Sequence, residues 1–189
     1  MRELTPLIAA TLNAVLPEQL RLCDLPPAAR INELEFHFAL RGASVQALMA
    51  LLHAHGVARE RHDFGAWTQL SGLMNGKIDL TYRHQGRVYV MDYKSNQLPA
   101  FDAQTLEQTM AASEYDLQAL LYTLAVHRWM RLRMGAAYDY ERDFGGVRYV
   151  FCRGLSAGEP GRGICMPQFP LALVLAMEEL LVSPQEQAA

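Results

Sequence analysis

The sequence predicts an α/β protein in which one mixed β-sheet is flanked by α-helices. Its 189 residues are 51% apolar and 20% charged, a composition that suits one globular domain with a sizeable core. Residues 72–95 have the pattern of a β-hairpin, and segments with helical spacing of apolar residues precede and follow it. This order of strands and helices predicts a sheet packed against helices, mixed because it contains a hairpin. We expect residues 1–189 to form a single domain with a helical N-terminal extension over 1–30.

The first third of the chain is expected to alternate helix, strand and helix. Apolar residues at helical spacing predict an amphipathic helix over about 3–16. Residues 34–40 alternate apolar and polar side chains, which predicts a half-buried strand with acidic residues on its other face. Ser44 suits a helix N-cap and Gly56 a helix end, so a second helix is expected between them. An irregular stretch should follow over about 57–68.

The hairpin and the segments after it complete the expected fold. Both arms, 77–83 and 87–94, are rich in β-branched and aromatic residues and surround a turn at Gln85-Gly86. Helices are expected over about 102–112 and 114–133. The second has Ser113 and Asp116 in the spacing of a capping box, and Gly135 ends it. We then expect a strand over 146–153, a loop over 154–163 and a last helix over about 170–182.

Composition also excludes several classes of protein. A net charge of −3 argues against a free-standing polybasic nucleic-acid binder, although a local basic groove remains compatible with it. The longest uninterrupted apolar run, Leu171–Met177, is far shorter than the roughly 20 residues of a membrane helix. The three cysteines form neither a disulfide framework nor a CxxC metal motif. Glu3 and Asn13 interrupt what would be a signal peptide, so we expect a cytoplasmic protein with no membrane contact.

The informative residues of the hairpin are Asp79, Asp92 and Lys94. Asp92 and Lys94 are two residues apart in one strand and therefore share a face. A two-residue turn at Gln85-Gly86 pairs Asp79 with Asp92, whereas a three-residue turn puts Asp79 on the opposite face. We favour the first register, or an equivalent four-residue loop, which sets the two carboxylates opposite each other with Cβ atoms roughly 5 Å apart.

Two carboxylates this close repel each other unless a positive charge lies between them. Mg²⁺ is the expected partner, because it accepts one or two carboxylates and keeps water molecules that a phosphate substrate displaces. The ion would acidify the attacking water. Lys94 would direct its ammonium at that water or at the charge that develops on the phosphate. The competing interpretation is an exposed ladder of charges without chemistry.

The helix over 114–133 supplies a second pair of candidate residues. Gln118 and Tyr122 are four residues apart and share a face, with Cβ atoms about 6 Å apart. They lie beside a stripe of core leucines at 117, 120, 121 and 124. Taken alone, such a pair is typical of structure, and Glu33 and Glu35 on the expected first strand are likewise typical of a solvated face.

Together these motifs resemble a known family. The matching segments are Gly76-Lys-Ile-Asp-Leu, Asp92-Tyr-Lys-Ser-Asn, Tyr115-Asp-Leu-Gln-Ala-Leu-Leu-Tyr-Thr-Leu-Ala, Asp139-Tyr-Glu-Arg-Asp-Phe-Gly-Gly and Phe151-Cys-Arg-Gly. They resemble the C-terminal nuclease domain of exodeoxyribonuclease V beta subunits, the RecB type, from about Asn32 to the last helix. The resemblance implies the restriction-endonuclease-like PD-(D/E)xK fold, a mixed β-sheet flanked by α-helices. It also implies Mg²⁺-dependent hydrolysis of DNA phosphodiester bonds in repair and recombination.

The resemblance further implies which residues form the metal site. Asp79 and Asp92 match the metal-binding carboxylates, and the backbone carbonyl of Tyr93 matches a further ligand. Lys94 matches the catalytic lysine. The implied cofactor is Mg²⁺, in whose place Mn²⁺ or Ca²⁺ can bind.

Other matches lie around that site. Glu33 matches an upstream active-site glutamate and is preferred to Glu35. Gln118 and Tyr122 match a Gln-x-x-x-Tyr motif that contacts DNA or the lysine. The arginines at 128, 131 and 133 either contact a DNA backbone or form a solvated helix face, and we favour the second.

The resemblance also concerns a larger enzyme. The family has a metal-ligand histidine in an upstream Gly-Thr-x-x-His setting, and residues 1–16 contain no histidine. We therefore expect a fragment of a helicase–nuclease subunit or a shortened relative. No GxxxxGK[ST] motif occurs, so no ATP site is expected. The implied partners are single DNA strands delivered by a helicase, and the alpha and gamma subunits of exodeoxyribonuclease V. The alternative is a truncated, non-catalytic module that docks partner subunits.

Overall fold

A five-stranded mixed sheet forms the centre of the computed structural model, which describes residues 4–156 and 159–182. Its strands are β1 (Arg30–Ser44), β2 (Gln69–His84), β3 (Arg87–Lys94), β4 (Phe144–Phe151) and β5 (Ile164–Cys165). They lie in the order β1-β2-β3-β4-β5. The β3–β4 pair is parallel and the other three pairs are antiparallel, so the predicted mixed sheet is confirmed.

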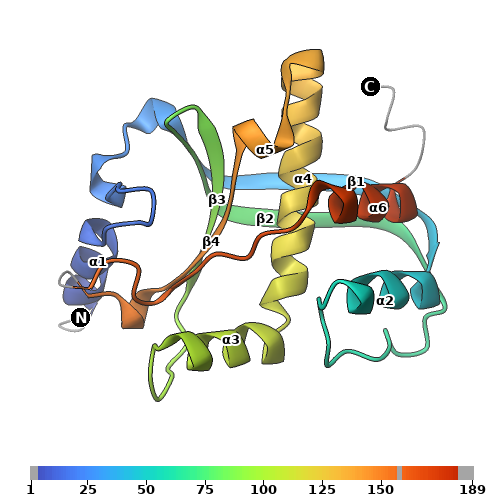
Figure 1. The fold of residues 1–189 in the computed structure, drawn as a ribbon, viewed down its shortest axis with the longest axis horizontal. Helices are drawn as coiled ribbons and strands as arrows, with labels where there is room; N and C mark the ends of the chain where they lie inside the picture. Colours follow the sequence, from blue (N-terminus) through green and yellow to red (C-terminus); the bar gives the residue numbers. More distant parts are fainter. Residues whose placement is uncertain (1–3, 157–158, 183–189) are drawn as a thin grey trace.

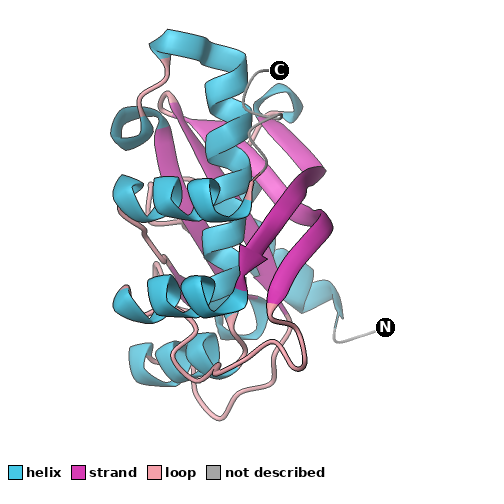
Figure 2. Cartoon of the chain, turned by 90° about the vertical axis from the view of Figure 1, so that its right-hand side faces the viewer, coloured by secondary structure: helices cyan, strands magenta, loops and turns pink. Residues whose placement is uncertain are grey.

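Helices cover the sheet mainly on one side. The α-helices are α1 (Leu4–Asn13), α2 (Val45–Ala54), α3 (Ala103–Ala112), α4 (Tyr115–Met134), α5 (Tyr140–Asp143) and α6 (Leu171–Leu181). Figure 1 shows the long α4 crossing the sheet, with α2, α3 and α6 around it. The view turned by 90° shows these helices stacked on one side and the strands on the other (Figure 2). None of the helices in the described ranges has the length and apolar character needed to cross a membrane.

Two hydrophobic clusters hold these layers together. The larger one packs α2, α4 and α6 against sheet residues that include Ile78, Val90 and Tyr149. The smaller one covers the opposite face, where leucines between residues 16 and 25 pack on Tyr82 and Met91. The segment after α1 therefore serves as the second cover of the sheet, which burial of apolar surface on both faces requires.

The turn between β2 and β3 has the predicted two-residue form. Gln85 and Gly86 have φ angles of 47° and 82°, and positive values at both central residues are those of a type I′ hairpin turn. His84 pairs with Arg87, and the ladder continues to the pair Leu80–Met91. The three-residue alternative is thereby excluded. The pairs expected beyond this point, 79 with 92 and 77 with 94, are absent from the ladder.

One predicted helix cap is wrong, although α4 starts within one residue of the expected position. Ser113 ends α3 instead of capping α4. Residue Glu114 precedes α4 in a left-handed conformation, with φ 53° and no side-chain capping bond. The carboxylate of Asp116 is used elsewhere, because its Oδ2 accepts a hydrogen bond of 2.8 Å from the backbone N–H of Ala58. Ser44, by contrast, caps α2 as predicted and accepts from the N–H of Ala47.

A buried carboxylate joins α6 to α4. The Glu178 residue is 4% exposed, and its oxygens lie 2.7 Å from Nη1 of Arg128 and 2.8 Å from Nη1 of Arg131. Burial alone would raise the pKa of Glu178, but the hydrogen bonds and charges of the two arginines outweigh it and lower this pKa. Two of the three arginines considered for DNA contact are therefore paired with a buried carboxylate of the protein itself.

We expect Glu178→Ala to lower the free energy of unfolding by about 3 kcal/mol, because it leaves two guanidinium groups facing a site built for their counter-charge. Urea denaturation followed by circular dichroism measures the change. The neighbouring Glu179 is exposed, so Glu179→Ala should stay within about 0.5 kcal/mol of wild type. Equal losses in the two variants would contradict this view of the α4–α6 contact.

Candidate active site

A buried ion pair marks the end of β3 that faces α4. The Nζ atom of Lys94 lies 2.6 Å from Oδ1 of Asp92, and the two side chains are 11% and 6% exposed. Both residues share the face of β3 that carries Val90, because side chains two apart on a strand point the same way. The sequence therefore puts this carboxylate and this ammonium inside the larger cluster, where charges need partners.

Asp79 lies where β2 and β3 separate. It is the residue immediately before Leu80, whose pair with Met91 is the last of the β2–β3 ladder when counted from the turn. Its Oδ2 accepts a hydrogen bond of 2.9 Å from the backbone N–H of Tyr93, the residue between Asp92 and Lys94. The carboxylate thus takes over a bond that a regular ladder would have given to a backbone carbonyl. Asp79 reaches the same point of β3 as Asp92 without pairing with it across the sheet.

The strands change phase at this position. Ile78 belongs to the cluster under α4, whereas Leu80 belongs to the cluster on the opposite face, although regular alternation would put both on one side. In β1, Glu33 lies between the residues that pair with Leu80 and Ile78, and its φ is 53°. A left-handed residue inside a strand is uncommon. The positive φ of Glu33 and the parting of β2 from β3 coincide with this change of face beside Asp79.

The pKa of Asp92 is raised, chiefly because the carboxyl is buried. The ammonium of Lys94 and the hydroxyl of Tyr122 act in the opposite direction, and the negative charge of Asp79 raises this pKa further. The charge of Asp79 also raises the pKa of Tyr122, after burial and the nearby Asp92. The two carboxylates, which come from neighbouring strands, are therefore close enough to interact electrostatically.

Gln118 and Tyr122 of α4 complete a hydrogen-bonded network with this pair. Lys94 Nζ donates to Gln118 Oε1 at 3.0 Å, and Gln118 Nε2 donates to the Tyr122 hydroxyl at 3.0 Å. That hydroxyl lies 3.1 Å from both Asp92 Oδ2 and the backbone oxygen of Lys77. Both oxygens of Asp92 are thus held, one by Lys94 and one by Tyr122. The structure brings Asp92, Lys94, Gln118 and Tyr122 together, in the arrangement that the family resemblance implied.

Glu33 lies elsewhere in this structure. Its Oε2 is 3.2 Å from Nζ of Lys77, Glu35 is 3.3 Å from the same amine, and both glutamate side chains are at least 70% exposed. The two hydrogen bonds raise the pKa of Lys77, that from Glu33 more than that from Glu35. Glu33 has no contact with Lys94 or Asp92 among the described interactions. It pairs instead with Lys77, whose backbone oxygen lies 3.1 Å from the Tyr122 hydroxyl of the network.

Three residues that sequence reasoning left without a role shape the site. The hydroxyl of Tyr149 donates to Gln118 Oε1 at 2.9 Å, and Tyr149 pairs with Asp92 in the parallel β3–β4 ladder. The ring of Tyr115 lies 3.9 Å from Lys94 Nζ. A Cβ atom at Gly76 would lie 2.4 Å from the Phe36 ring, which packs edge-on against Tyr122. The β3–β4 register, once known, would have identified Tyr149.

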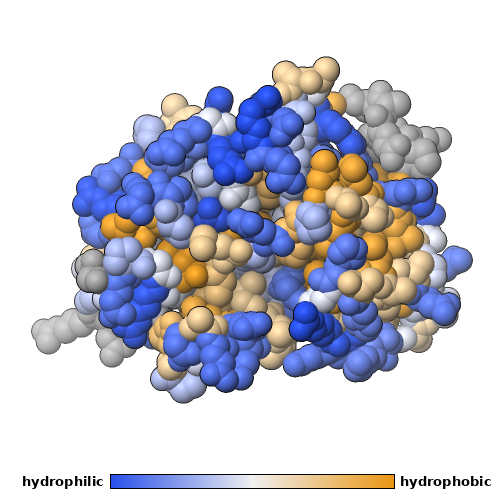
Figure 3. Space-filling view, viewed as in Figure 1, coloured by the Kyte–Doolittle hydropathy of each residue, from blue (hydrophilic) through white to orange (hydrophobic). Residues whose placement is uncertain are grey.

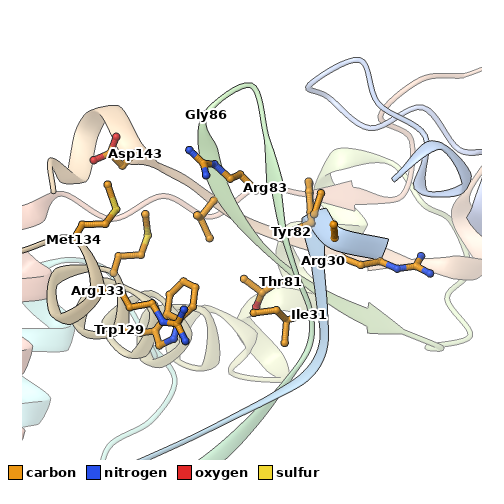
Figure 4. Close-up of a pocket in the computed structure, with 14 residues that line it drawn as sticks. Arg30, Ile31, Thr81, Tyr82, Arg83, Gly86, Trp129, Arg133, Met134 and Asp143 are labelled. Carbon is orange, nitrogen blue, oxygen red and sulfur yellow. The ribbon is translucent and has the colours of Figure 1, made fainter. Parts of the chain in front are cut away.

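Grooves lie beside the network. One of 460 Å³ includes Lys77 and Glu35 in its lining, and one of 260 Å³ includes Tyr115 and Gln118. A third, of 420 Å³, lies beside the C-terminal half of α4 and contains none of the expected site residues. Figure 4 shows Trp129 and Arg133 together on one side of it, with Arg30 directed away from them. The guanidinium of Arg133 lies 4.8 Å from the Trp129 ring centroid.

The donor atoms of the site are oxygens that suit a hard divalent cation. Within residues 4–156 and 159–182, no group of three or more His, Cys, Asp or Glu side chains gathers as a metal site. Asp79 and Asp92 provide two carboxylates, and Mg²⁺ is commonly held by one or two carboxylates plus water and substrate oxygens. Burial and, to a lesser degree, the charge of Asp79 raise the pKa of Asp92, and a bound cation would act in the opposite direction. The residues present therefore fit such an ion.

The sequence of this chain matches a known protein family. The family model described as the PD-(D/E)XK nuclease superfamily matches residues 10–164. The chain therefore belongs to the PD-(D/E)XK nuclease superfamily, and the mixed sheet with its flanking helices is the fold expected for it.

Within this superfamily, the chain is similar to RecB subunits of several bacteria. The RecBCD enzyme subunit RecB of Escherichia coli (strain K12) is 46% identical over 59% of this chain and 10% of its own length. The corresponding subunit of Haemophilus influenzae is 38% identical over 83% of this chain and 13% of its own length. That of Mycobacterium tuberculosis (strain CDC 1551 / Oshkosh) is 39% identical over 59% of the chain and 11% of the relative. The RecB-type resemblance is confirmed, and the chain spans about a tenth of the length of these relatives.

The left-handed backbone of Glu33 should affect the free energy of unfolding of variants at this position. Glycine adopts this conformation without the penalty of about 1 kcal/mol that other residues incur. We expect Glu33→Gly to be more stable than Glu33→Ala by about 1 kcal/mol. At Glu35, which lacks a positive φ, alanine should be more stable than glycine by about 0.5 kcal/mol. Chemical denaturation of the four variants tests this reversal, and the same order at both positions would contradict it.

Proposed function

We propose that this chain is the nuclease domain of a RecB-type helicase–nuclease subunit and hydrolyses phosphodiester bonds of DNA with a divalent cation. The observation that carries the proposal is the buried Asp92–Lys94 pair, 2.6 Å apart, with Asp79 held beside it at the backbone of Tyr93. A charge ladder on a solvated strand would need neither burial nor a hydrogen-bonded network. Membership of the nuclease superfamily supports the same interpretation.

Asp79, Asp92 and the backbone carbonyl of Tyr93 are the proposed ligands, and Mg²⁺ is the proposed ion. When bound, such an ion supplies Lewis-acid charge for a phosphate oxygen and lowers the pKa of water. Mn²⁺ and Ca²⁺ prefer related oxygen ligands and should compete for the same atoms. The N–H of Tyr93 already holds Asp79, so the backbone that orients one carboxylate also carries the third proposed donor.

The protein's own residues would then orient and stabilise charge. Lys94, fixed between Asp92 and Gln118, keeps its positive charge beside Asp92, where that charge would stabilise negative charge that develops on the phosphate. Tyr122 restrains the second oxygen of Asp92. Since these contacts exist before substrate binds, little reorganisation is needed during the reaction. Glu33 is proposed as a further active-site carboxylate, preferred to Glu35.

The relatives' names extend the proposal to an assembly. They are described as subunits of the RecBCD enzyme, so we propose alpha and gamma subunits as partners and single DNA strands from a helicase as substrate. A net charge of −3 suits a domain to which DNA is delivered, since fewer phosphate contacts are then needed. The proposed setting is DNA repair and recombination in the cytoplasm, in a single domain without an ATP site.

A docking module is the second candidate function. Hydrophobic atoms gather over α6 in Figure 3, and Leu175 of that helix is 42% exposed. Such a surface suits contact with another protein. It is compatible with a nuclease that works inside an assembly, so cation binding and cleavage separate the two functions.

Loss of either central charge should abolish cleavage without unfolding the protein. We expect Asp79→Ala and Lys94→Ala to lower kcat for single-stranded DNA with Mg²⁺ by at least about 100-fold, because charge stabilisation of this kind contributes on the order of 100-fold or more. Circular dichroism should report an unchanged fold. Glu107→Gln, an exposed carboxylate on α3, is the control and should cleave as wild type does. Equal cleavage by all four proteins would reject the assignment.

Binding of the ion can be measured without substrate. Titration calorimetry with Mn²⁺ should give one binding event or more for wild type, and a much weaker one for Asp79→Asn and Asp92→Asn. Glu107→Gln should bind as wild type does. A docking module has no need of the ion, so wild type without measurable binding would favour that function over the nuclease.

A further inference from the structure

Two tyrosine rings enclose the ammonium of Lys94. Its Nζ atom lies 3.9 Å from the centroid of the Tyr115 ring and 4.9 Å from that of Tyr149. The rings stack on each other with centroids 5.5 Å apart and planes at 14°. Tyr115 is the first residue of α4, and Tyr149 lies on β4, so helix and sheet both contribute to this enclosure.

Two oxygen atoms and two aromatic rings surround the ammonium of Lys94. Two oxygens lie within bonding distance, Oδ1 of Asp92 at 2.6 Å and Oε1 of Gln118 at 3.0 Å. The remaining side is occupied by aromatic faces, which attract a cation through the ring quadrupole. The position of Lys94 is therefore defined by four side chains from three elements, and only one of them is a carboxylate.

The hydroxyl of Tyr149 sets the orientation of the Gln118 amide. It donates to Oε1, the atom that also accepts from Lys94, while Nε2 donates to Tyr122. The reverse orientation would turn an N–H donor toward the ammonium. Tyr149 is completely buried, so neither the ring nor its hydroxyl has an alternative partner in water.

We propose that Tyr115 and Tyr149 are positioning residues that hold the Lys94 ammonium in place, through both ring faces and through the Tyr149–Gln118 hydrogen bond. The inference deepens the proposed nuclease function and rests on it for its catalytic consequence. The positioning itself is a property of the folded chain, so it can be measured without DNA and without a cation.

The sequence offers a direct probe, because the chain contains two lysines, Lys77 and Lys94. Isotope labelling of lysine therefore gives two sets of ε-CH₂ signals in an NMR spectrum. Lys94 lies over aromatic faces, whereas Lys77 pairs with glutamates and is 48% exposed. We expect ring currents to shift the Lys94 signal upfield and to leave Lys77 near the position of free lysine, as an internal reference.

Variants separate the ring from the hydroxyl. Tyr115→Leu should move the Lys94 signal toward that of free lysine and lower kcat about tenfold, with KM for DNA and Mn²⁺ affinity unchanged. Tyr115→Phe keeps the ring and should retain the shift and kcat within about twofold. Tyr149→Phe should keep the shift but lower kcat several-fold, since the Gln118 amide loses its guide. Tyr138→Leu removes a half-buried tyrosine outside the site and controls for general loss of stability.

The two proposals fail in different ways. A wild-type Lys94 signal at the free-lysine position, or one that Tyr115→Leu leaves unmoved, would overturn the positioning role even if the protein cleaves DNA. A shifted Lys94 signal that responds to Tyr115→Leu, in a protein that never cleaves DNA, would overturn the nuclease function and uphold the enclosure of the lysine. Equal loss of kcat in Tyr115→Leu and Tyr138→Leu would assign the effect to stability and contradict positioning.

Discussion

The contact between Asp92 and Lys94 constrains the whole site. Both side chains are almost fully removed from water and lie 2.6 Å apart. Burial of a carboxylate and an ammonium is unfavourable unless further hydrogen bonds satisfy the remaining donors and acceptors. Tyr122, Gln118 and the two stacked tyrosines meet that requirement here. Helix α4 must therefore lie where these side chains can reach β3, and its ends must be fixed accordingly.

Contacts far from the pair fix α4. At its start, Arg61 Nη2 lies 2.6 Å from Glu114 Oε2, and Asp116 binds the N–H of Ala58. Toward its end, Glu178 of α6 binds two arginines of the helix. The irregular segment after α2 thus has a structural purpose, since it anchors the turn of α4 that carries Gln118. Rigid support of this kind keeps reactive groups within the narrow geometry that catalysis requires.

Much of this arrangement could be predicted from periodicity and turn chemistry. Alternation identified part of β1, and β-branched and aromatic residues around Gln85-Gly86 identified the hairpin. The favoured two-residue turn predicted the register correctly as far as the pair Leu80–Met91. Helical spacing correctly put Gln118 and Tyr122 on one face. The left-handed backbone of Glu33 could not be predicted, since a left-handed glutamate has no local signal and depends on tertiary contacts. The short α5 and β5 were not predicted. The cap predicted for α4 was wrong, because Asp116 binds the N–H of Ala58 and Ser113 ends α3.

The resemblance to a nuclease family identified the expected site residues, and the structure shows which neighbouring side chains hold them in place. The spacing of Tyr115, Tyr149 and Gly76 in the sequence gives no sign of a role. In the structure their contacts help to position Lys94 and Tyr122. Glu33 shows the opposite case, because its motif points to the site while its side chain pairs with Lys77. Support by neighbouring side chains therefore depends on packing between elements, which a single sequence encodes only indirectly.

The central claim is that carboxylates from two separating strands converge on one divalent cation. Diffraction from crystals soaked in Mn²⁺, recorded at a wavelength where manganese scatters anomalously, tests it most directly. The account predicts an anomalous peak bounded by the carboxylates of Asp79 and Asp92 and the backbone oxygen of Tyr93. A soaked crystal with manganese bound only at other residues, and none between these three groups, would contradict it.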